Sequence, residues 1–239
     1  MTNKCILIVD AHCGDGELQV GAIAAKYAIA GYKVVFLHLT AGEKGNPPNM
    51  TVEKYRKQKI KESEEACKVL GAEAVTLDYK DAELEVNDEI VFRVAKMIRK
   101  LKPDIVITHW VKSIHSDHAN CPKIVAAAQL KAGLSGFDLD GLSPHYFRFF
   151  HSENWEDMED YRPDIFIDVS SEFTTYLEAI SKFWFVMNSK DFRYYNYYQA
   201  LGTIRGCTAR VKYAQTLKYP VGGNRYRGKE IPGLPIENF

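Results

Sequence analysis

The chain has 239 residues, 46% of them hydrophobic and 26% charged, and its 31 Lys and Arg balance its 31 Asp and Glu. This length predicts one domain with a proper core, and the composition excludes a disulfide-stapled miniprotein, wholesale disorder and a coiled coil. Because the formal net charge is zero, no overall electrostatic field attracts nucleic acid or an anionic membrane. The expected partner is therefore a small molecule.

The cysteines and the first residues indicate the compartment. The five cysteines are widely spaced, odd in number, and form no CxxC pair. Reduced thiols are therefore expected, as in cytoplasmic proteins. The apolar run at residues 5–9 is too short for a signal-peptide core or a spanning helix. We expect a soluble, cytoplasmic protein without a membrane partner.

The predicted elements alternate between strand and helix through the first two thirds of the chain. Strands are predicted at 6–10, 34–39, 74–78 and 105–109, and helices at 18–30, 52–70 and 89–101. A fourth helix at about 122–132 and strands at 146–150 and 164–169 follow. This alternation is typical of βαβ units. It predicts an α/β fold with a Rossmann-like, open, mainly parallel sheet and helices on both faces.

The last third of the chain differs in composition. Residues 173–219 are rich in Phe, Trp and Tyr, and the tail from residue 220 carries several Gly and Pro. Helices packed on one end of the sheet are predicted for the aromatic segment. This segment either roofs a site or buries the interface of a homo-oligomer. We predict a single domain over 1–239, with an α/β core at 1–150, a C-terminal strand and helices at 151–219, and an irregular tail at 220–239.

Two loops that follow predicted strands carry pairs of potential metal ligands. His12 and Asp15 follow the first strand, and His115 and His118 follow the fourth. Each pair has the i, i+3 spacing that lets its members converge if a helix begins there. In open α/β sheets, ligands bind beyond the carboxyl ends of the strands. Two imidazoles and one carboxylate suit a catalytic divalent metal, with Zn²⁺ as the first choice and Fe²⁺ as the alternative.

The first of these loops also has some likeness to a dinucleotide-binding fingerprint, because Gly14 and Gly16 directly follow a strand. The fingerprint needs Gly or Ala three residues after Gly16, where Gln19 stands. Asp15 would also repel a diphosphate. Dinucleotide binding is therefore disfavoured.

The two loops resemble the motifs of a known enzyme family. Residues 11–18, AHCGDGEL, resemble the AHPDDxEL motif of the LmbE-like, or PIG-L type, metal-dependent deacetylases of N-acetylglucosamine-containing compounds, and residues 115–118, HSDH, resemble the family's HxDH motif. Weaker similarities extend the resemblance over nearly the whole chain, at 40–45, 59–71, 102–104, 205–206 and 213–215.

The resemblance implies an activity and a set of roles. It implies a zinc-type hydrolase that removes an N-acetyl group from an acetamido-sugar substrate. It implies that His12, Asp15 and His118 bind the metal.

The resemblance also implies roles for residues around the metal. His115 would protonate the leaving amine or stabilise the oxyanion, and Asp117 would orient a histidine. Glu43 and Lys59 are implied at the substrate-facing rim, although a helix-capping carboxylate and a solvated helix lysine are equally compatible with them.

Gly14 departs from the family pattern, because the family has its general base, an aspartate, at that position. Three possibilities follow. The metal alone activates water, since coordination lowers the pKa of water to about 7; another carboxylate, preferably Asp10 and otherwise Glu17, replaces the base; or the protein is a metal- or sugar-binding relative without hydrolase activity. Cys13, in place of the family's proline, is either a spectator or a fourth metal ligand.

Overall fold

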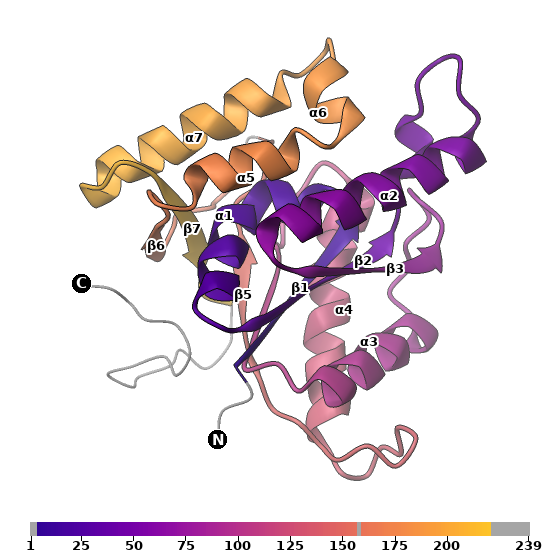
Figure 1. Cartoon of the computed structure of the whole chain (residues 1–239). Coiled ribbons are helices and arrows are strands. Elements are labelled where there is room, and N and C mark those ends of the chain that lie inside the picture. The colour runs from indigo at the N-terminus through magenta and orange to yellow at the C-terminus, as the bar shows by residue number, and fades with distance from the viewer. Residues whose placement is uncertain (1–3, 157–158, 221–239) are drawn as a thin grey trace.

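The computed structural model describes residues 4–156 and 159–220 (Figure 1). Its sheet has seven strands in the order β3-β2-β1-β4-β5-β7-β6. Their bounds are β1 (Cys5–His12), β2 (Lys33–Thr40), β3 (Glu73–Tyr79), β4 (Ile105–His109), β5 (Arg148–Ser152), β6 (Ile165–Asp168) and β7 (Ala214–Lys218). The first five strands pair in parallel, and β7 runs antiparallel to both β5 and β6. The prediction of an open, mainly parallel sheet is confirmed.

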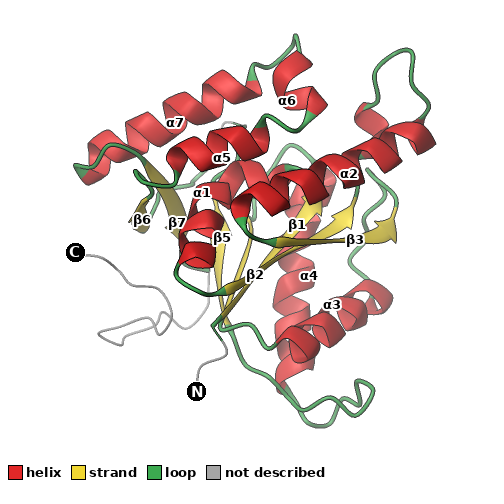
Figure 2. Ribbon diagram, in the orientation of Figure 1, coloured by secondary structure: helices red, strands yellow, loops and turns green. Residues whose placement is uncertain are grey.

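Helices cover both faces of this sheet, as Figure 2 shows. The helices are α1 (Asp15–Ile29), α2 (Val52–Leu70), α3 (Asp88–Leu101), α4 (Ser116–Gly133), α5 (Phe173–Ile180), α6 (Trp184–Asn188) and α7 (Tyr194–Ala209), with a short 3₁₀ turn, η1 (Glu43–Gly45), after β2. Helices α3 and α4 lie on one face, and the other helices lie on the opposite face. Within the described ranges, no helix is long and apolar enough to cross a membrane.

The first strand shows why the sequence reads as continuous apolar runs. Ile6 and Ile8 pack with the helices of one face, whereas Leu7 and Val9 pack with those of the other. Successive side chains of a strand point to opposite faces, so a strand covered on both sides needs apolar residues at every position.

Several predicted elements differ from the structure in their bounds, and one differs in its type. Helix α4 begins at Ser116 rather than near residue 122, because the His115 ring caps it by accepting a hydrogen bond from the Asp117 main-chain N–H at 3.2 Å. Strand β5 occupies 148–152 rather than 146–150. Strand β7 lies in the segment predicted as helical, because short strands depend on their tertiary partners more than on intrinsic preference. Residues 221–239 of the predicted tail lie outside the described residues.

The strand order brings the two metal-ligand loops together. Strand β1 pairs with β2 on one side and with β4 on the other. The chain leaves β1 toward β2 and β3, and returns to β4 across the sheet. The loops after β1 and β4 therefore meet at the carboxyl edge, at the switch point where open α/β sheets bind ligands.

Candidate metal centre and its cleft

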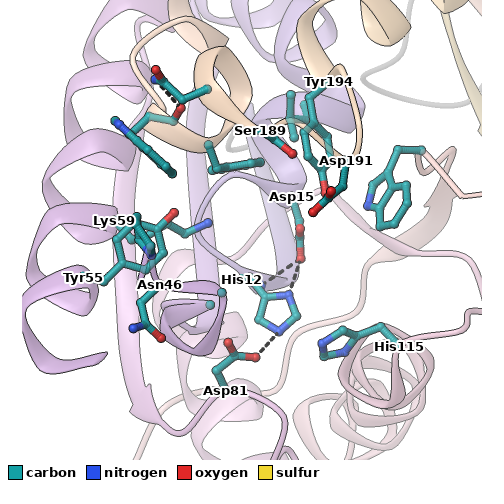
Figure 3. Close-up of a pocket in the computed structure, with 18 of the residues that line it drawn as sticks. His12, Asp15, Asn46, Tyr55, Lys59, Asp81, His115, Ser189, Asp191 and Tyr194 are labelled. Atoms are coloured by element: carbon teal, nitrogen blue, oxygen red, sulfur yellow. Dashed lines mark hydrogen bonds and ion pairs between the residues drawn. The ribbon is translucent and has the colours of Figure 1, made fainter. Parts of the chain in front are cut away.

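A cleft of about 770 Å³ opens at the carboxyl edge of the sheet. His12 at the end of β1, Asp15 at the start of α1 and His118 in the first turn of α4 line its floor. The walls come from the loop after β2, from α2, and from the segment around α6 and the start of α7 (Figure 3). The cleft thus joins the α/β core to the aromatic C-terminal segment, which forms part of its wall.

The three side chains that the resemblance implied as metal ligands meet on this floor. His12 Nδ1 lies 3.0 Å from Asp15 Oδ2 and 3.0 Å from His118 Nε2, and the last two atoms are 3.2 Å apart. Metal–ligand bonds of about 2.0–2.2 Å at tetrahedral angles put donor atoms about 3.3–3.6 Å apart, slightly wider than the spacing found here. These residues therefore fit a divalent ion in spacing and in donor chemistry. Their role as ligands stays a prediction.

Asp15 is held in the ionised form that a metal requires. Burial opposes the charge on this carboxylate. The attraction of the nearby His118 and His12 rings nevertheless holds the pKa of Asp15 well below its usual value.

His12 is fixed from behind by two carboxylates. Its Nε2 lies 3.1 Å from Asp81 Oδ1 and 3.3 Å from Asp117 Oδ2. Asp117 is itself anchored by the Ala82 main-chain N–H at 2.8 Å. Burial opposes a positive charge on His12, yet Asp15, Asp117 and Asp81 raise its pKa well above the usual value. The surroundings of this ring therefore favour positive charge, which a divalent ion would supply.

Asp81 was missed by the sequence analysis. It is buried, lines the cleft and follows β3 directly. Burial opposes its ionisation, but the hydrogen bond and charge of His12 lower the pKa of Asp81 to about 2. The sequence could have indicated Asp81, because it lies just beyond the end of a predicted strand, as the residues of the other two loops do.

His118 is oriented by residues that the sequence analysis also missed. Its Nδ1 lies 3.1 Å from Asn154 Nδ2 and 3.5 Å from Glu156 Oε1, and both residues follow β5. The His109 ring stacks on it with centroids 4.4 Å apart. Burial and the positive charge of His118 lower the pKa of His109 to about 4, and its Nε2 accepts a hydrogen bond from the Ala11 N–H at 3.1 Å. These contacts leave His118 Nε2 directed at the floor.

His115 faces the cleft as a neutral ring. Burial and the neighbouring charges of His12 and His118 lower its pKa. Its Nδ1 accepts the main-chain N–H of Asp117, so the single proton of the neutral ring sits on Nε2. The ring centroids of His12 and His118 lie 4.7 and 4.8 Å away. His115 therefore offers a hydrogen-bond donor beside the ligand set.

The carboxylates considered as replacements for the base do not line the cleft. Asp10, which is 1% exposed, has its Oδ1 2.6 Å from His38 Nδ1. Glu17 accepts hydrogen bonds from the Ser63 hydroxyl at 2.6 Å and from the Gly14 N–H at 3.0 Å. The prediction of Asp10 as a base is corrected on this ground, because its pairing with His38 holds it on the α1 and α2 side of the sheet.

An aromatic ring fills the space beside Gly14. The residue has a φ of 105°, a conformation that favours glycine, and a Cβ atom there would lie 3.0 Å from two atoms of the Phe185 ring. The neighbouring Cys13 is fully buried, with its Sγ 3.4 Å from Thr76 Oγ1, and it does not line the cleft. Cys13 is therefore a spectator rather than a fourth ligand.

The two residues implied at the substrate rim differ in their positions. Glu43 is buried outside the cleft lining and accepts hydrogen bonds from Arg56 Nη1 at 3.1 Å and from the Asp81 N–H at 3.3 Å. Its placement at the rim is therefore corrected, since it anchors the loop that carries Asp81. Lys59 lines the cleft and is 6% exposed, so it is not a solvated helix lysine.

Comparison with known proteins gives related sequences and structures. A family model described as "PIG-L: GlcNAc-PI de-N-acetylase" matches residues 7–129. The 4-oxalmesaconate hydratase of Pseudomonas putida is 28% identical over 188 residues, 74% of this chain and 72% of that protein. The diacetylchitobiose deacetylase of Thermococcus kodakarensis is 26% identical over 189 residues, 74% of this chain and 68% of that protein. The crystal structure of GalB, the 4-carboxy-2-hydroxymuconate hydratase from P. putida, matches with a TM-score of 0.83 and 23% identity, covering 93% of this chain and 99% of that one.

Metal analysis tests the ligand set. After chelation and readdition of Zn²⁺, we expect the wild-type protein to bind one ion per chain and His12→Ala or His118→Ala to lose most of it, because each removes one of three donors. His145→Ala is the matched control, since its ring contacts the Pro103 carbonyl at 2.7 Å, away from the cleft. Equal stoichiometry and affinity in all four proteins would contradict the assignment.

Proposed function

This chain belongs to the PIG-L family, and from that premise we propose that it is a divalent-metal-dependent hydrolase of linear amide bonds. The proposed reaction removes the N-acetyl group of an N-acetylglucosamine-like sugar conjugate. The observation that carries the proposal is the meeting of His12, Asp15 and His118 donors within 3.2 Å on the floor of a cleft. The similarity to a diacetylchitobiose deacetylase supports the choice of an acetamido substrate.

The chain's own residues prepare two imidazole lone pairs for a metal. When bound, a divalent ion supplies Lewis acidity, which polarises an acyl carbonyl and makes water more acidic. His12 Nε2 faces the carboxylates of Asp81 and Asp117, so the proton of the ring is kept on Nε2. The lone pair of Nδ1 is therefore left free to bind a metal. The Glu156 carboxylate, with Oε1 3.5 Å from His118 Nδ1, keeps the proton of that ring on Nδ1 and leaves Nε2 free to bind a metal.

His115 is suited to one of the two roles that the resemblance implied. Its Nδ1 is occupied as an acceptor by the cap of α4, so the ring holds one proton, on Nε2. A neutral imidazole donates a hydrogen bond readily but gives up its only proton with difficulty. We therefore assign His115 to stabilising the developing oxyanion rather than to protonating the amine.

A carboxylate from the C-terminal segment takes the place of the missing base in this proposal. Within the described residues, the carboxylates that line the cleft are Asp15, Asp81 and Asp191. Asp15 and Asp81 are engaged with histidines. Asp191, in the loop between α6 and α7, extends into the cleft (Figure 3). It would accept a proton from the attacking water and return it to the amine nitrogen as the C–N bond breaks.

A second candidate is hydration of a carbon–carbon double bond in an acidic compound. It is favoured by Gly14, which has Phe185 packed against it where a deacetylase base is expected, and by the similarity to 4-oxalmesaconate hydratase. A catalytically impaired metal- or sugar-binding relative is the further alternative. Acetate release from a panel of N-acetyl sugars, and water addition to unsaturated carboxylates, separate the three.

His115→Ala tests the oxyanion assignment. We expect kcat for acetate release to fall by about 100- to 1000-fold, since that is the usual cost of removing one oxyanion donor, with unchanged Zn²⁺ content. His115→Gln, which keeps an N–H donor, should recover part of the loss. Turnover of His115→Ala equal to that of the His145→Ala control would refute the role.

Asp191→Asn tests the replacement base. We expect kcat to fall by about 100-fold or more with metal content intact, whereas Asp88→Asn, at an exposed ion pair with Lys131, should keep its activity. Full activity in Asp191→Asn would exclude the role. Gly14→Asp is no test of this role, because a Cβ there would meet the Phe185 ring and the φ of 105° strains any residue other than glycine.

A further inference from the structure

Among the described residues, one buried cation in the wall of the cleft has no ion-pair partner. Lys59 lies in the middle of α2, lines the cleft and is 6% exposed. Its Nζ lies 4.1 Å from the Phe185 ring centroid and 5.8 Å from that of Phe183. Within residues 4–156 and 159–220, no carboxylate forms an ion pair with it and no acceptor takes a hydrogen bond from it. By contrast Lys57, two residues earlier, is exposed and pairs with Glu53 at 3.0 Å.

The burial of the Lys59 ammonium group is unfavourable unless an anion binds to it. Removing an ammonium group from water is costly, and an aromatic ring offsets only part of that cost. The carboxylate three residues later, Glu62, accepts a hydrogen bond from Gln58 at 2.7 Å and forms no ion pair with Lys59. Burial raises the pKa of Glu62, although the charge of Lys59 acts to lower it. Asp15 and Asp81 are already engaged with histidines on the floor. Lys190, the other lysine of the cleft lining, is exposed and has no such need.

The position of Lys59 relative to the floor is fixed by packing. The Phe185 ring that contacts the Lys59 ammonium group also packs against Gly14. Gly14 lies at the start of α1, the helix that contributes Asp15. Tyr55 lines the cleft one helical turn before Lys59, so its hydroxyl adds a neutral donor to the same wall (Figure 3). The cleft therefore has a floor with the three potential metal ligands and, apart from it, a wall with the positive charge of Lys59.

We propose that Lys59 binds an oxyanion carried by the substrate, a carboxylate or a phosphate, while the reacting group occupies the floor formed by His12, Asp15 and His118. The substrate is then an acidic compound rather than a neutral acetamido sugar. This inference rests on the proposed function only in placing the reacting group on that floor. The recognition of the anion is independent of whether the reaction is amide hydrolysis or hydration.

Direct binding measurements test the anion site without turnover. Inorganic phosphate and succinate are titrated calorimetrically into the wild type, Lys59→Met, Lys59→Arg and Lys190→Met. We expect Lys59→Met to weaken binding by about 10- to 100-fold, the usual range for a lost charge-assisted hydrogen bond. Lys59→Arg should retain binding, and Lys190→Met should change Kd by less than about 2-fold. Lys59→Met is nearly isosteric and can pack against Phe185, and its thermal unfolding is recorded to verify folding.

The same titrations in the His118→Ala background separate this site from anion binding at a metal. We expect the effect of Lys59→Met to persist there, because the wall is independent of the ligand set. If phosphate and succinate bind equally with and without Lys59 in both backgrounds, the anion site is overturned. If all binding disappears in His118→Ala alone, the anions bind at the floor and the inference is likewise overturned.

Substrate comparison distinguishes the source of the oxyanion and keeps the two proposals apart. N-acetylglucosamine is compared with N-acetylglucosamine 6-phosphate and with N-acetylmuramic acid, which carries a carboxylate. We expect KM to be lower for one acidic sugar, and Lys59→Met to remove that preference. Turnover of all three with equal KM would leave the hydrolase function standing and overturn the anion site. Lys59-dependent anion binding without turnover of any of them would support the site and contradict the deacetylase function.

Discussion

The attraction between the Asp15 carboxylate and the imidazoles of His12 and His118 is the interaction on which the cleft depends. It is possible because β1 lies between β2 and β4, so that two loops far apart in the sequence share one edge of the sheet. Donor atoms 3.0–3.2 Å apart are costly to bury without a shared cation. The fold therefore brings the three side chains together at one edge of the sheet, and their donor atoms favour the binding of a cation between them.

The residues that contact the three side chains determine which of their atoms can bind a cation. Asp81 and Asp117 contact Nε2 of His12, and the Glu156 carboxylate contacts Nδ1 of His118. Each partner fixes which nitrogen carries the proton, which decides which nitrogen can bind a metal. On the other side of the sheet, Asp10, His38 and Glu17 form a separate buried network. That network supports the first loop, since Glu17 accepts the Gly14 N–H, but it does not reach the cleft.

Much of this arrangement could be predicted from the sequence, and its failures have physical causes. Apolar runs and helical periodicity identified the strands and helices of the core, and two short motifs identified His12, Asp15 and His118. Asp10 was misjudged because its direction depends on register, which pairs it with His38 on β2. Asp81 and His109 were missed because their role depends on which loops the tertiary structure brings together. The surroundings of Gly14 could not be foreseen, since Phe185 is distant in sequence.

The most direct test of the central claim is anomalous diffraction from crystals of the protein loaded with Zn²⁺. The account predicts a single strong peak within about 2.0–2.2 Å of His12 Nδ1, Asp15 Oδ2 and His118 Nε2. A peak bound elsewhere, or none at this floor at saturating Zn²⁺, would contradict the account whatever the family relationship.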